Sequence, residues 1–475
     1  MSLNIPLVVL VVYVALLTLL SWKATQIQER GKGGKMLNYL LAGRQLPTIL
    51  IATMLTGLAV GGASTVGVAE QAYTKGLSAG WYNGAWGTGG IVVGLFLAAK
   101  FRKMERSTIP EMMGLAYGGG ARFIGVIVQL LIMMTITSLQ YVAGGAILAS
   151  MLPDYFTLTT GMLASAVVFI GITVVGGYWA SGITNVVNVV IIYVGILAAL
   201  YSGFNNLGGY DSVMASLPEG PWLDPIGGIG LAIVMGWMAV MITQCCTTQA
   251  VTQIALAAKD ENAARNGFIL GGILTLPAGF LCAFFGIMAA SKFPGLPNAA
   301  LALPTIAKEV ISPAVGGIFL AALWAADVST AVALLMGCST LLIKDVILPN
   351  FNRDGKELSP NTELFISRVG VLLVSVCSLY LAMTAVGILQ TITSALAMTT
   401  SFTLLIVVNL YAPRLCKKSS GFCVILTSLV IWALWTWAPS TRIGPHVIYA
   451  EWIICALVFA ITSALDPRPA GRLLA

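Results

Sequence analysis

Charged residues are scarce in this sequence: Asp, Glu, Lys and Arg make up only 9% of its 475 residues, whereas 58% are hydrophobic. Water-soluble domains carry roughly 25% charged residues. This composition excludes a water-soluble fold and predicts an all-α membrane protein that crosses the bilayer many times. Because a membrane-spanning helix needs about 20 mostly apolar residues, such segments are the natural unit in which to divide the chain.

Residues and motifs used by most enzymes are also scarce. The chain has one histidine, His446, and its eight cysteines show none of the paired spacings of metal sites. The adjacent Cys245 and Cys246 suit neither a zinc site nor an ordinary disulfide. No glycine-rich phosphate loop, nucleophile elbow or HExxH motif is present. We therefore expect no enzyme activity and no organic cofactor.

Long apolar segments are frequent along the whole chain. Thirteen are predicted to span a membrane, near 4–22, 47–73, 77–99, 121–151, 156–178, 183–204, 227–254, 264–290, 312–343, 364–386, 388–411, 420–438 and 444–465. The polar segments between them are too short for a separate soluble domain.

The basic residues are distributed unequally between the two sides of the predicted membrane. If the chain begins outside, only Lys75, Lys292, Lys308 and Arg442 of its 25 Lys and Arg residues fall in outer loops. By the positive-inside rule, the N-terminus is then outside and the C-terminus cytoplasmic. Basic residues spread over many loops do not favour nucleic-acid binding. Short outer loops without an N-x-S/T acceptor suggest the plasma membrane of a bacterium, its inner membrane.

Two predicted spans contain residues that disfavour a continuous membrane helix. The segment LTGLAVGGASTVGVAEQAY (55–73) has four glycines, each of which costs about 1 kcal/mol relative to alanine in a helix. The segment MGWMAVMITQCCTTQAVTQ (235–253) is rich in Thr and Gln side chains, which need protein or water partners inside a membrane. The glycines fit either close helix packing or a broken helix whose freed carbonyls bind a cation.

These two spans are the second and the seventh, so they cross the membrane in opposite directions. Interrupted helices at matching positions of two inverted five-helix repeats indicate a binding site at mid-membrane. We therefore predict one transporter domain. Residues 1–45 hold a peripheral helix and a cytoplasmic loop, 46–204 and 227–412 form the two repeats, and 413–475 add two peripheral helices.

A single carboxylate interrupts the ninth predicted span, LAALWAADVSTAVALLMGCST (320–340). Asp327 is followed by the hydroxyl residues Ser329 and Thr330. Serine and threonine in membrane helices often bond only to their own backbone, but oxygen atoms are also the ligands that hard cations prefer. An ionisable residue inside a membrane is costly and marks a functional site by default.

At this point the sequence resembles the sodium:solute symporters, which include the sodium/proline, sodium/pantothenate and sodium/galactose carriers. The stretch VVGGYWASGITNVVN (174–188) is similar to the family's glycine-containing turn, and QIALAAKDENAARNG (253–267) to its Q-R-x-L-A-A-K-S run. AADVSTA (325–331) resembles the segment that supplies sodium-site hydroxyls. The resemblance covers nearly the whole chain and implies the inverted-repeat fold of the leucine transporter.

The resemblance also implies a sodium site between the second and ninth spans. Carbonyls would come from Gly57, Val60 and Ala326, and hydroxyls from Ser329 and Thr330.

The solute would bind next to this sodium site. The residues implied to line the solute site are Ser64, Thr65, Asn83, Trp86, Gln140, Gln244, Gln249 and Thr393. They include no Arg, Lys or His, so a neutral or zwitterionic solute fits better than a dicarboxylate. An amino acid, a sugar, a nucleobase-like compound and a monocarboxylate all remain open.

Three positions depart from the family's pattern. The family often has an aspartate where this chain has Asn185 and an arginine where it has Ile254, and Asp327 replaces an apolar residue. We therefore expect Asp327 and Asn185 to take part in ion coupling. Either Asp327 compensates for the carboxylate that is missing at position 185, or it carries a coupling proton.

The leading interpretation is a secondary active transporter that takes up a small polar organic solute with sodium by alternating access. The alternative is proton-coupled symport through Asp327. A solute-sensing membrane module is a less favoured alternative, because sensor relatives of this fold carry a kinase extension and this chain ends soon after its last predicted span. The expected partners are the solute and the lipid bilayer, with no nucleic acid and no obligate protein partner.

Overall fold

The computed structural model describes residues 5–30, 34–351, 359–383 and 388–474. Its α-helices are α1 (Ile5–Arg30), α2 (Lys35–Leu41), α3 (Thr48–Ala59), α4 (Val68–Lys75), α5 (Trp81–Phe96), α6 (Ala98–Met104), α7 (Ile109–Tyr117), α8 (Gly119–Met151), α9 (Leu158–Asn206), α10 (Tyr210–Ala215), α11 (Leu231–Thr247), α12 (Gln249–Leu256), α13 (Glu261–Lys292), α14 (Ala302–Glu309), α15 (Pro313–Leu341), α16 (Leu348–Phe351), α17 (Pro360–Ala382), α18 (Ile388–Ala397), α19 (Thr399–Tyr411), α20 (Lys418–Trp437) and α21 (Val447–Leu465).

Short 3-10 or π-helical segments join some of these helices. They are η1 (Ala42–Arg44), η2 (Ala63–Gly67), η3 (Gly76–Gly80), η4 (Ala299–Leu301), η5 (Leu342–Ile347), η7 (Pro413–Leu415) and η8 (Pro439–Thr441). Extended structure in the described ranges is limited to two isolated bridges, Leu46 with Ala258 and Lys417 with Pro469. The all-α prediction is therefore confirmed.

Nine helices of the described chain are long and apolar enough to cross a membrane, and two bent helix pairs bring the number to eleven. The 49-residue helix α9 covers the predicted spans 156–178 and 183–204, and it is broken at Gly177, where φ is 56°. The bent pair 48–96 likewise covers two predicted spans. The exact number of thirteen stays a prediction.

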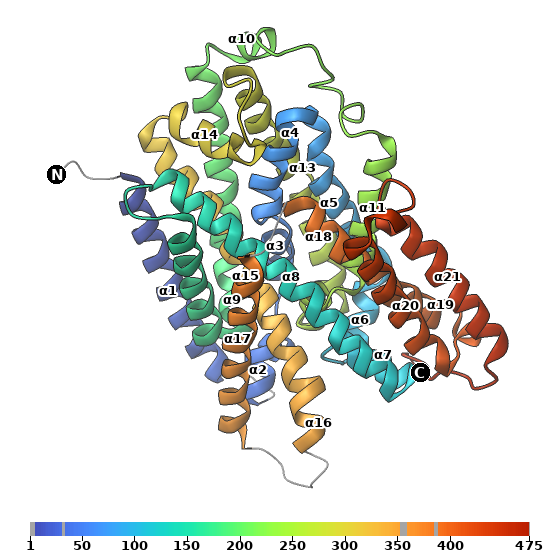
Figure 1. Ribbon diagram of the computed structural model, residues 1–475. Coiled ribbons are helices and arrows are strands. Elements are labelled where there is room, and N and C mark those ends of the chain that lie inside the picture. Colours follow the sequence, from blue (N-terminus) through green and yellow to red (C-terminus); the bar gives the residue numbers. More distant parts are fainter. Residues whose placement is uncertain (1–4, 31–33, 352–358, 384–387, 475) are drawn as a thin grey trace.

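Helix α15 is the centre of the bundle. Within its most apolar window 94% of the residues are buried, and the helix packs against α1, α3, α8, α9 and α17. A helix that is apolar on all sides is stable only when other elements surround it. By contrast, α1, α20 and α21 bury a third or less of their windows and lie at the edges of the molecule (Figure 1).

Both spans that were expected to be interrupted are broken. Helix α3 ends before Val60, whose φ of −99° and ψ of 82° are not helical, and the chain resumes at Ala63 with a 56° bend. Helices α11 and α12 meet at Thr248 with a 49° bend. The glycines at 57–67 therefore accompany a real break and not only close packing.

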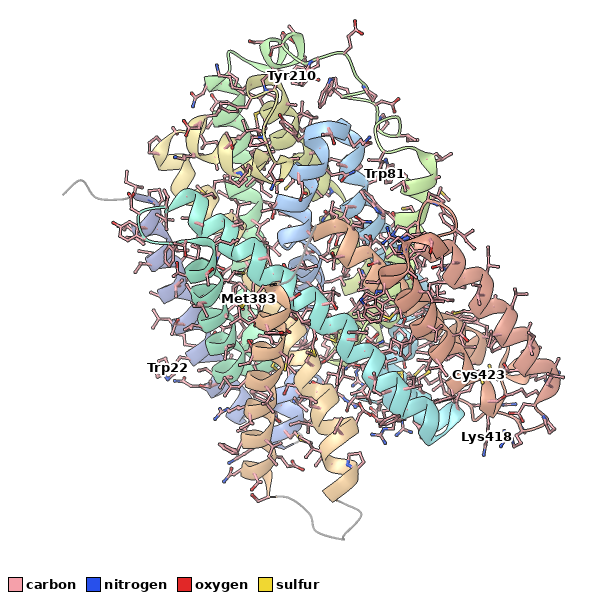
Figure 2. The ribbon with its side chains drawn as sticks, in the orientation of Figure 1. Trp22, Trp81, Tyr210, Met383, Lys418 and Cys423 are labelled. Atoms are coloured by element: carbon pink, nitrogen blue, oxygen red, sulfur yellow. The ribbon has the colours of Figure 1, made fainter. Side chains whose placement is uncertain are left out.

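The two ends of the bundle differ. Figure 2 shows Tyr210, the first residue of α10, at one end and Lys418, the first residue of α20, toward the opposite end, where Figure 1 places α16. We call these the α10 end and the α16 end. At the α16 end, backbone hydrogen bonds join Leu46 to Ala257 and Lys259, and Gln253 Nε2 donates to Leu40 O and Thr340 Oγ1. We call the hydrogen bonds around Gln253 and its neighbour Gln249 the seal of the α16 end.

An ion pair between a partly exposed arginine and a buried aspartate connects two helices at the α16 end. Arg122 at the start of α8 lies 2.9 Å from Asp345 in η5, and the Asp345 side chain is fully buried. The Arg122 guanidinium also donates to the carbonyl of Lys344 at 2.8 Å. Because a carboxylate is costly to bury without a partner, this pair holds α8 against the end of α15.

Removing the Arg122 partner should therefore destabilise the protein. We expect Arg122→Ala to cost about 3–5 kcal/mol, since Asp345 would stay buried without its cation. The matched control Arg106→Ala breaks a more exposed pair with Glu111 and should cost less than about 1 kcal/mol. Thermal unfolding in detergent measures both, and equal effects would contradict a fastening role for the Arg122 pair.

Candidate functional site

The break between α3 and η2 brings four oxygen atoms together at the middle of the bundle. Ser329 Oγ lies 2.7 Å from Gly57 O and 2.8 Å from Ala326 O. Thr330 Oγ1 lies 3.0 Å from Gly57 O and 3.2 Å from Ala326 O. Carbonyls at the end of a helix lack intrahelical partners, so Gly57 O is available to a group from α15. All four residues are buried.

Two further positions lie beside this oxygen cluster. Val60 is fully buried at the point where α3 leaves helical geometry, so it belongs to the same break. Asn185 on α9 faces Gly57 so closely that a Cβ on Gly57 would lie 2.0 Å from Asn185 Oδ1. The Asn185 amide nitrogen donates to Ser181 O at 2.7 Å, whereas Oδ1 has no hydrogen-bond partner among the described residues.

Asp327 and Asn185 lie on opposite sides of the break between α3 and η2. It is fully buried, and neither carboxylate oxygen has a hydrogen-bond partner in the described part of the chain. A Cβ on Gly62 would lie 2.7 Å from Asp327 Oδ1, and a Cβ on Gly144 would lie 3.5 Å from Oδ2. Asn185 therefore faces the end of α3, while Asp327 faces the start of η2.

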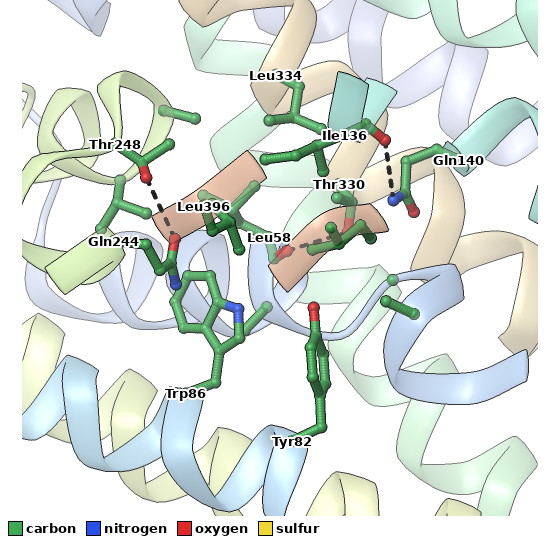
Figure 3. Close-up of a pocket in the computed structure, with 16 residues that line it drawn as sticks. Leu58, Tyr82, Trp86, Ile136, Gln140, Gln244, Thr248, Thr330, Leu334 and Leu396 are labelled. Atoms are coloured by element: carbon green, nitrogen blue, oxygen red, sulfur yellow. Dashed lines mark hydrogen bonds between the residues drawn. The ribbon is translucent and has the colours of Figure 1, made fainter. Parts of the chain in front are cut away.

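A closed cavity of ≈ 30 Å³ lies next to the oxygen cluster. Gln140 and Thr330 lie on one side of it, Gln244 and Thr248 on the other, and the rings of Trp86 and Tyr82 along a third (Figure 3). Solute sites usually have volumes of about 300–1,000 Å³. A solute can occupy this position only after the surrounding helices move apart.

The predicted solute residues separate into three groups. Trp86, Gln140 and Gln244 line the cavity. Ser64 and Thr65 are buried beside it, but their hydroxyls donate to the carbonyls of Ala59 and Gly61 within the break.

The remaining three lie elsewhere. Asn83 faces Gly279 of α13, where a Cβ would lie 3.0 Å from Asn83 Oδ1. Gln249 belongs to the seal at the α16 end, because its Nε2 donates to Ser107 O and its Oε1 accepts from Ile109 N. Thr393 lines a separate cavity toward the α10 end.

Helix α18 separates the two cavities. Its residues Ile392 and Leu396 line the closed cavity, whereas Thr393 lines the second cavity, of ≈ 260 Å³, together with Trp237 and His446. His446 Nδ1 accepts from the backbone of Ile448, and burial lowers the pKa of this imidazole to about 4. In this conformation α18 and the contact between the Tyr82 and Trp237 rings lie between the two cavities.

Sequence reasoning missed two polar groups of the closed cavity, Tyr82 and Thr248. Tyr82 is four residues before Trp86, so both rings point from one face of α5. That spacing was a usable signal. Thr248 is the single residue between α11 and α12, and only the bend at that point turns it toward Gln244, whose Oε1 lies 3.4 Å from the Thr248 hydroxyl.

A helical membrane protein with an oxygen-lined site at a broken helix has the architecture of a secondary transporter. Comparison with known proteins agrees with this class. Residues 39–426 match the model of the sodium:solute symporter family. The chain belongs to that family.

Several curated proteins are similar to this chain. It is 24% identical over 427 residues to sodium/glucose cotransporter 4 of Danio rerio, covering 78% of this chain and 61% of that protein. It is 23% identical over 489 residues to the osmoregulated proline transporter OpuE of Bacillus subtilis, covering 99% and 96%. It is 24% identical over 347 residues to the sodium/pantothenate symporter of Haemophilus influenzae, covering 70% and 71%.

Solved structures show the same fold. A Na⁺-coupled sialic acid symporter in a substrate-bound outward-open state superposes with a TM-score of 0.80 at 16% identity, covering 98% of both chains. MhsT in complex with L-phenylalanine superposes with a TM-score of 0.53 at 16% identity, covering 88% of this chain and 98% of that one. The leucine-transporter type of fold expected from the sequence is therefore confirmed.

The tight approach at Gly57 gives a test of the oxygen cluster. In Gly57→Ala the new methyl would meet Asn185 Oδ1 at 2.0 Å and Ser329 Cβ at 3.2 Å, which should push α9 and α15 away from the break. We expect loss of any stabilisation by sodium in a thermal unfolding assay. The control Gly171→Ala places its methyl in open space and should keep the sodium response; if Gly57→Ala keeps it too, the close approach is unimportant for the ion.

Proposed function

We propose that this protein is a sodium-coupled symporter that takes up a small polar organic solute by alternating access. The oxygen cluster formed by Gly57, Ala326, Ser329 and Thr330 is the observation that carries the proposal. Each of the two hydroxyls lies within 3.2 Å of both carbonyls, and these neutral oxygen atoms are the ligands that a hard cation prefers. Val60 and the unpartnered Asn185 Oδ1 can complete the shell.

Sodium at this position would couple ion binding to a change of conformation. It would bridge the end of α3 and the middle of α15, two helices that pack together and are linked by bonds from the Ser329 and Thr330 hydroxyls to carbonyls of α3. A ligand shifts a conformational equilibrium by its difference in affinity for the two states. The state in which α3 and α15 are close is therefore the one that sodium favours.

The solute site would form where Trp86, Gln140 and Gln244 surround the closed cavity. In this assignment the α10 end faces outside and the α16 end faces the cytoplasm, as the distribution of basic residues predicts. Entry requires α18 to move away, and release requires the seal around Gln249 and Gln253 to open. Residues 46–204 and 227–412 would be the two inverted repeats of this cycle, and the membrane would be the inner membrane of a bacterium.

Thermal stability of the full-length protein in detergent tests the sodium site. Titration with sodium should give a saturable stabilisation, about 2.7 kcal/mol at 100 times the dissociation constant, and potassium should not. The double variant Ser329→Ala with Thr330→Ala should lose the effect, because two of the ligands are removed.

Thr137→Ala is a matched control for this experiment. The Thr137 hydroxyl is also buried, but it donates only to Met133 O within its own helix. This variant should keep the full sodium response. Stabilisation that is equal in sodium and potassium, or that survives in the double variant, would contradict the assignment of the ion site.

Proton coupling through Asp327 is the second candidate. The burial of both carboxylate oxygens without a partner favours it, since an intramembrane carboxylate commonly relays protons. If protons are the coupling ions, Asp327→Asn should abolish the pH dependence of ion-driven uptake in proteoliposomes. If sodium is the coupling ion, the variant should keep sodium dependence and alter only the apparent sodium affinity.

A further inference from the structure

The broken second span presents two helix ends of opposite polarity to the centre of the membrane. The carbonyl end of α3 carries partial negative charge, and the amide end of the half-helix that begins with η2 and continues into α4 carries partial positive charge. In transporters with broken helices, the carbonyl end coordinates the cation and the amide end points at an anionic group of the substrate. The chemistry at each end therefore constrains what the solute can carry.

Asp327 lies at the amide end. Its Oδ1 is 2.7 Å from the place where a Cβ on Gly62 would stand, directly before the first residue of η2. The backbone N–H of Gly62 donates to Gln140 Oε1 at 3.0 Å. A Cβ on Gly61 would lie 2.7 Å from the same Gln140 oxygen. Gln140 also lines the solute cavity, so the amide end that Asp327 faces lies beside that cavity.

The surroundings of Asp327 are neutral. Besides Gly62 and Gln140 they include Gly144 and Ser165, and a Cβ on Gly144 would lie 2.7 Å from Ser165 Oγ and 3.5 Å from Asp327 Oδ2. Ser165 Oγ in turn accepts from Trp324 Nε1 at 3.1 Å. The side chains that line the solute cavity in the described chain also include no Lys, Arg or His.

Resting on the proposed function, we propose that Asp327 supplies the carboxylate for the amide end of the broken helix, so that the transported solute is a polar molecule without a carboxylate. Asp327 and the cluster residue Thr330 are one helical turn apart on α15. Sodium bound at the oxygen cluster and the Asp327 carboxylate then balance each other's charge. A solute carboxylate at the break would meet an existing one in a medium of low dielectric, where repulsion is strong. An uncharged polyol or sugar fits this site, and carboxylic acids and amino acids do not.

Acetate offers a test that needs no knowledge of the solute. In Asp327→Gly the amide end loses its carboxylate and gains space, so sodium acetate should stabilise this variant saturably more than sodium chloride at equal sodium concentration. Wild-type protein should show no difference between the two salts. The control Ser339→Gly removes a buried side chain of the same helix that bonds to Ser367 O, and it should also show no difference.

Matched pairs of compounds test the wild-type protein without any substitution. The pairs are D-glucose with D-glucuronate, L-prolinamide with L-proline, and pantothenol with pantothenate, each titrated at saturating sodium. We expect the carboxylate-free member of a binding pair to bind at least tenfold more tightly, which corresponds to about 1.4 kcal/mol. Tighter binding of a carboxylate member overturns the inference, even if Asp327→Gly fails to fold.

The sodium response separates this inference from the proposed function. A folded Asp327→Gly that sodium stabilises and acetate does not affect overturns the role of Asp327 and leaves sodium coupling intact. If sodium does not stabilise the wild-type protein, the proposed function itself is overturned. If sodium acetate stabilises Asp327→Gly more than sodium chloride does, and wild-type protein shows no such difference, the inference is supported.

Discussion

The contact between the end of α3 and the middle of α15 is the interaction on which the site depends. A continuous second span would satisfy its own carbonyls and leave Ser329 and Thr330 only the Ala326 carbonyl of their own helix to bind. Because the helix stops at Val60, the Gly57 carbonyl is available to α15. The absence of a side chain at Gly57 lets Asn185 approach from α9. Three elements far apart in sequence thus meet at one residue, Gly57.

The same break explains why a carboxylate can persist in a segment that is otherwise apolar. An unpaired charge in a membrane interior is costly, yet Asp327 lies where a half-helix begins and the local dipole favours negative charge. The sequence-based hypothesis that Asp327 replaces a carboxylate missing at Asn185 places both residues in one electrostatic role. The structure gives them different neighbours: Asn185 faces Gly57 and Asp327 faces Gly62.

The sealing of the two ends is unequal, and this asymmetry bears on the transport cycle. At the α16 end, backbone bonds, glutamine amides and the Arg122–Asp345 pair connect several helices. Toward the α10 end, the short helix α18 and the contact between the Tyr82 and Trp237 rings stand between the closed cavity and a larger one. In the proposed cycle, a movement of α18 would join the two cavities and leave the hydrogen bonds of the α16 end intact.

The sequence by itself determined the membrane class from composition, and its glycine and hydroxyl placement pointed to the two spans that are broken. The residues of the oxygen cluster came from the resemblance to the symporter family. The sequence also singled out Asp327, since a charge in an apolar segment is visible without coordinates. Only the tertiary structure decided which side chains reach the cavity. Asn83, Gln249 and Thr393 face α13, the α16-end seal and the second cavity, because helix rotation and the bend at Thr248 set their directions. The spacing of Tyr82 and Trp86 puts both rings on one face of α5, but only the packing of α5 against α11 and α13 turns that face toward the cavity.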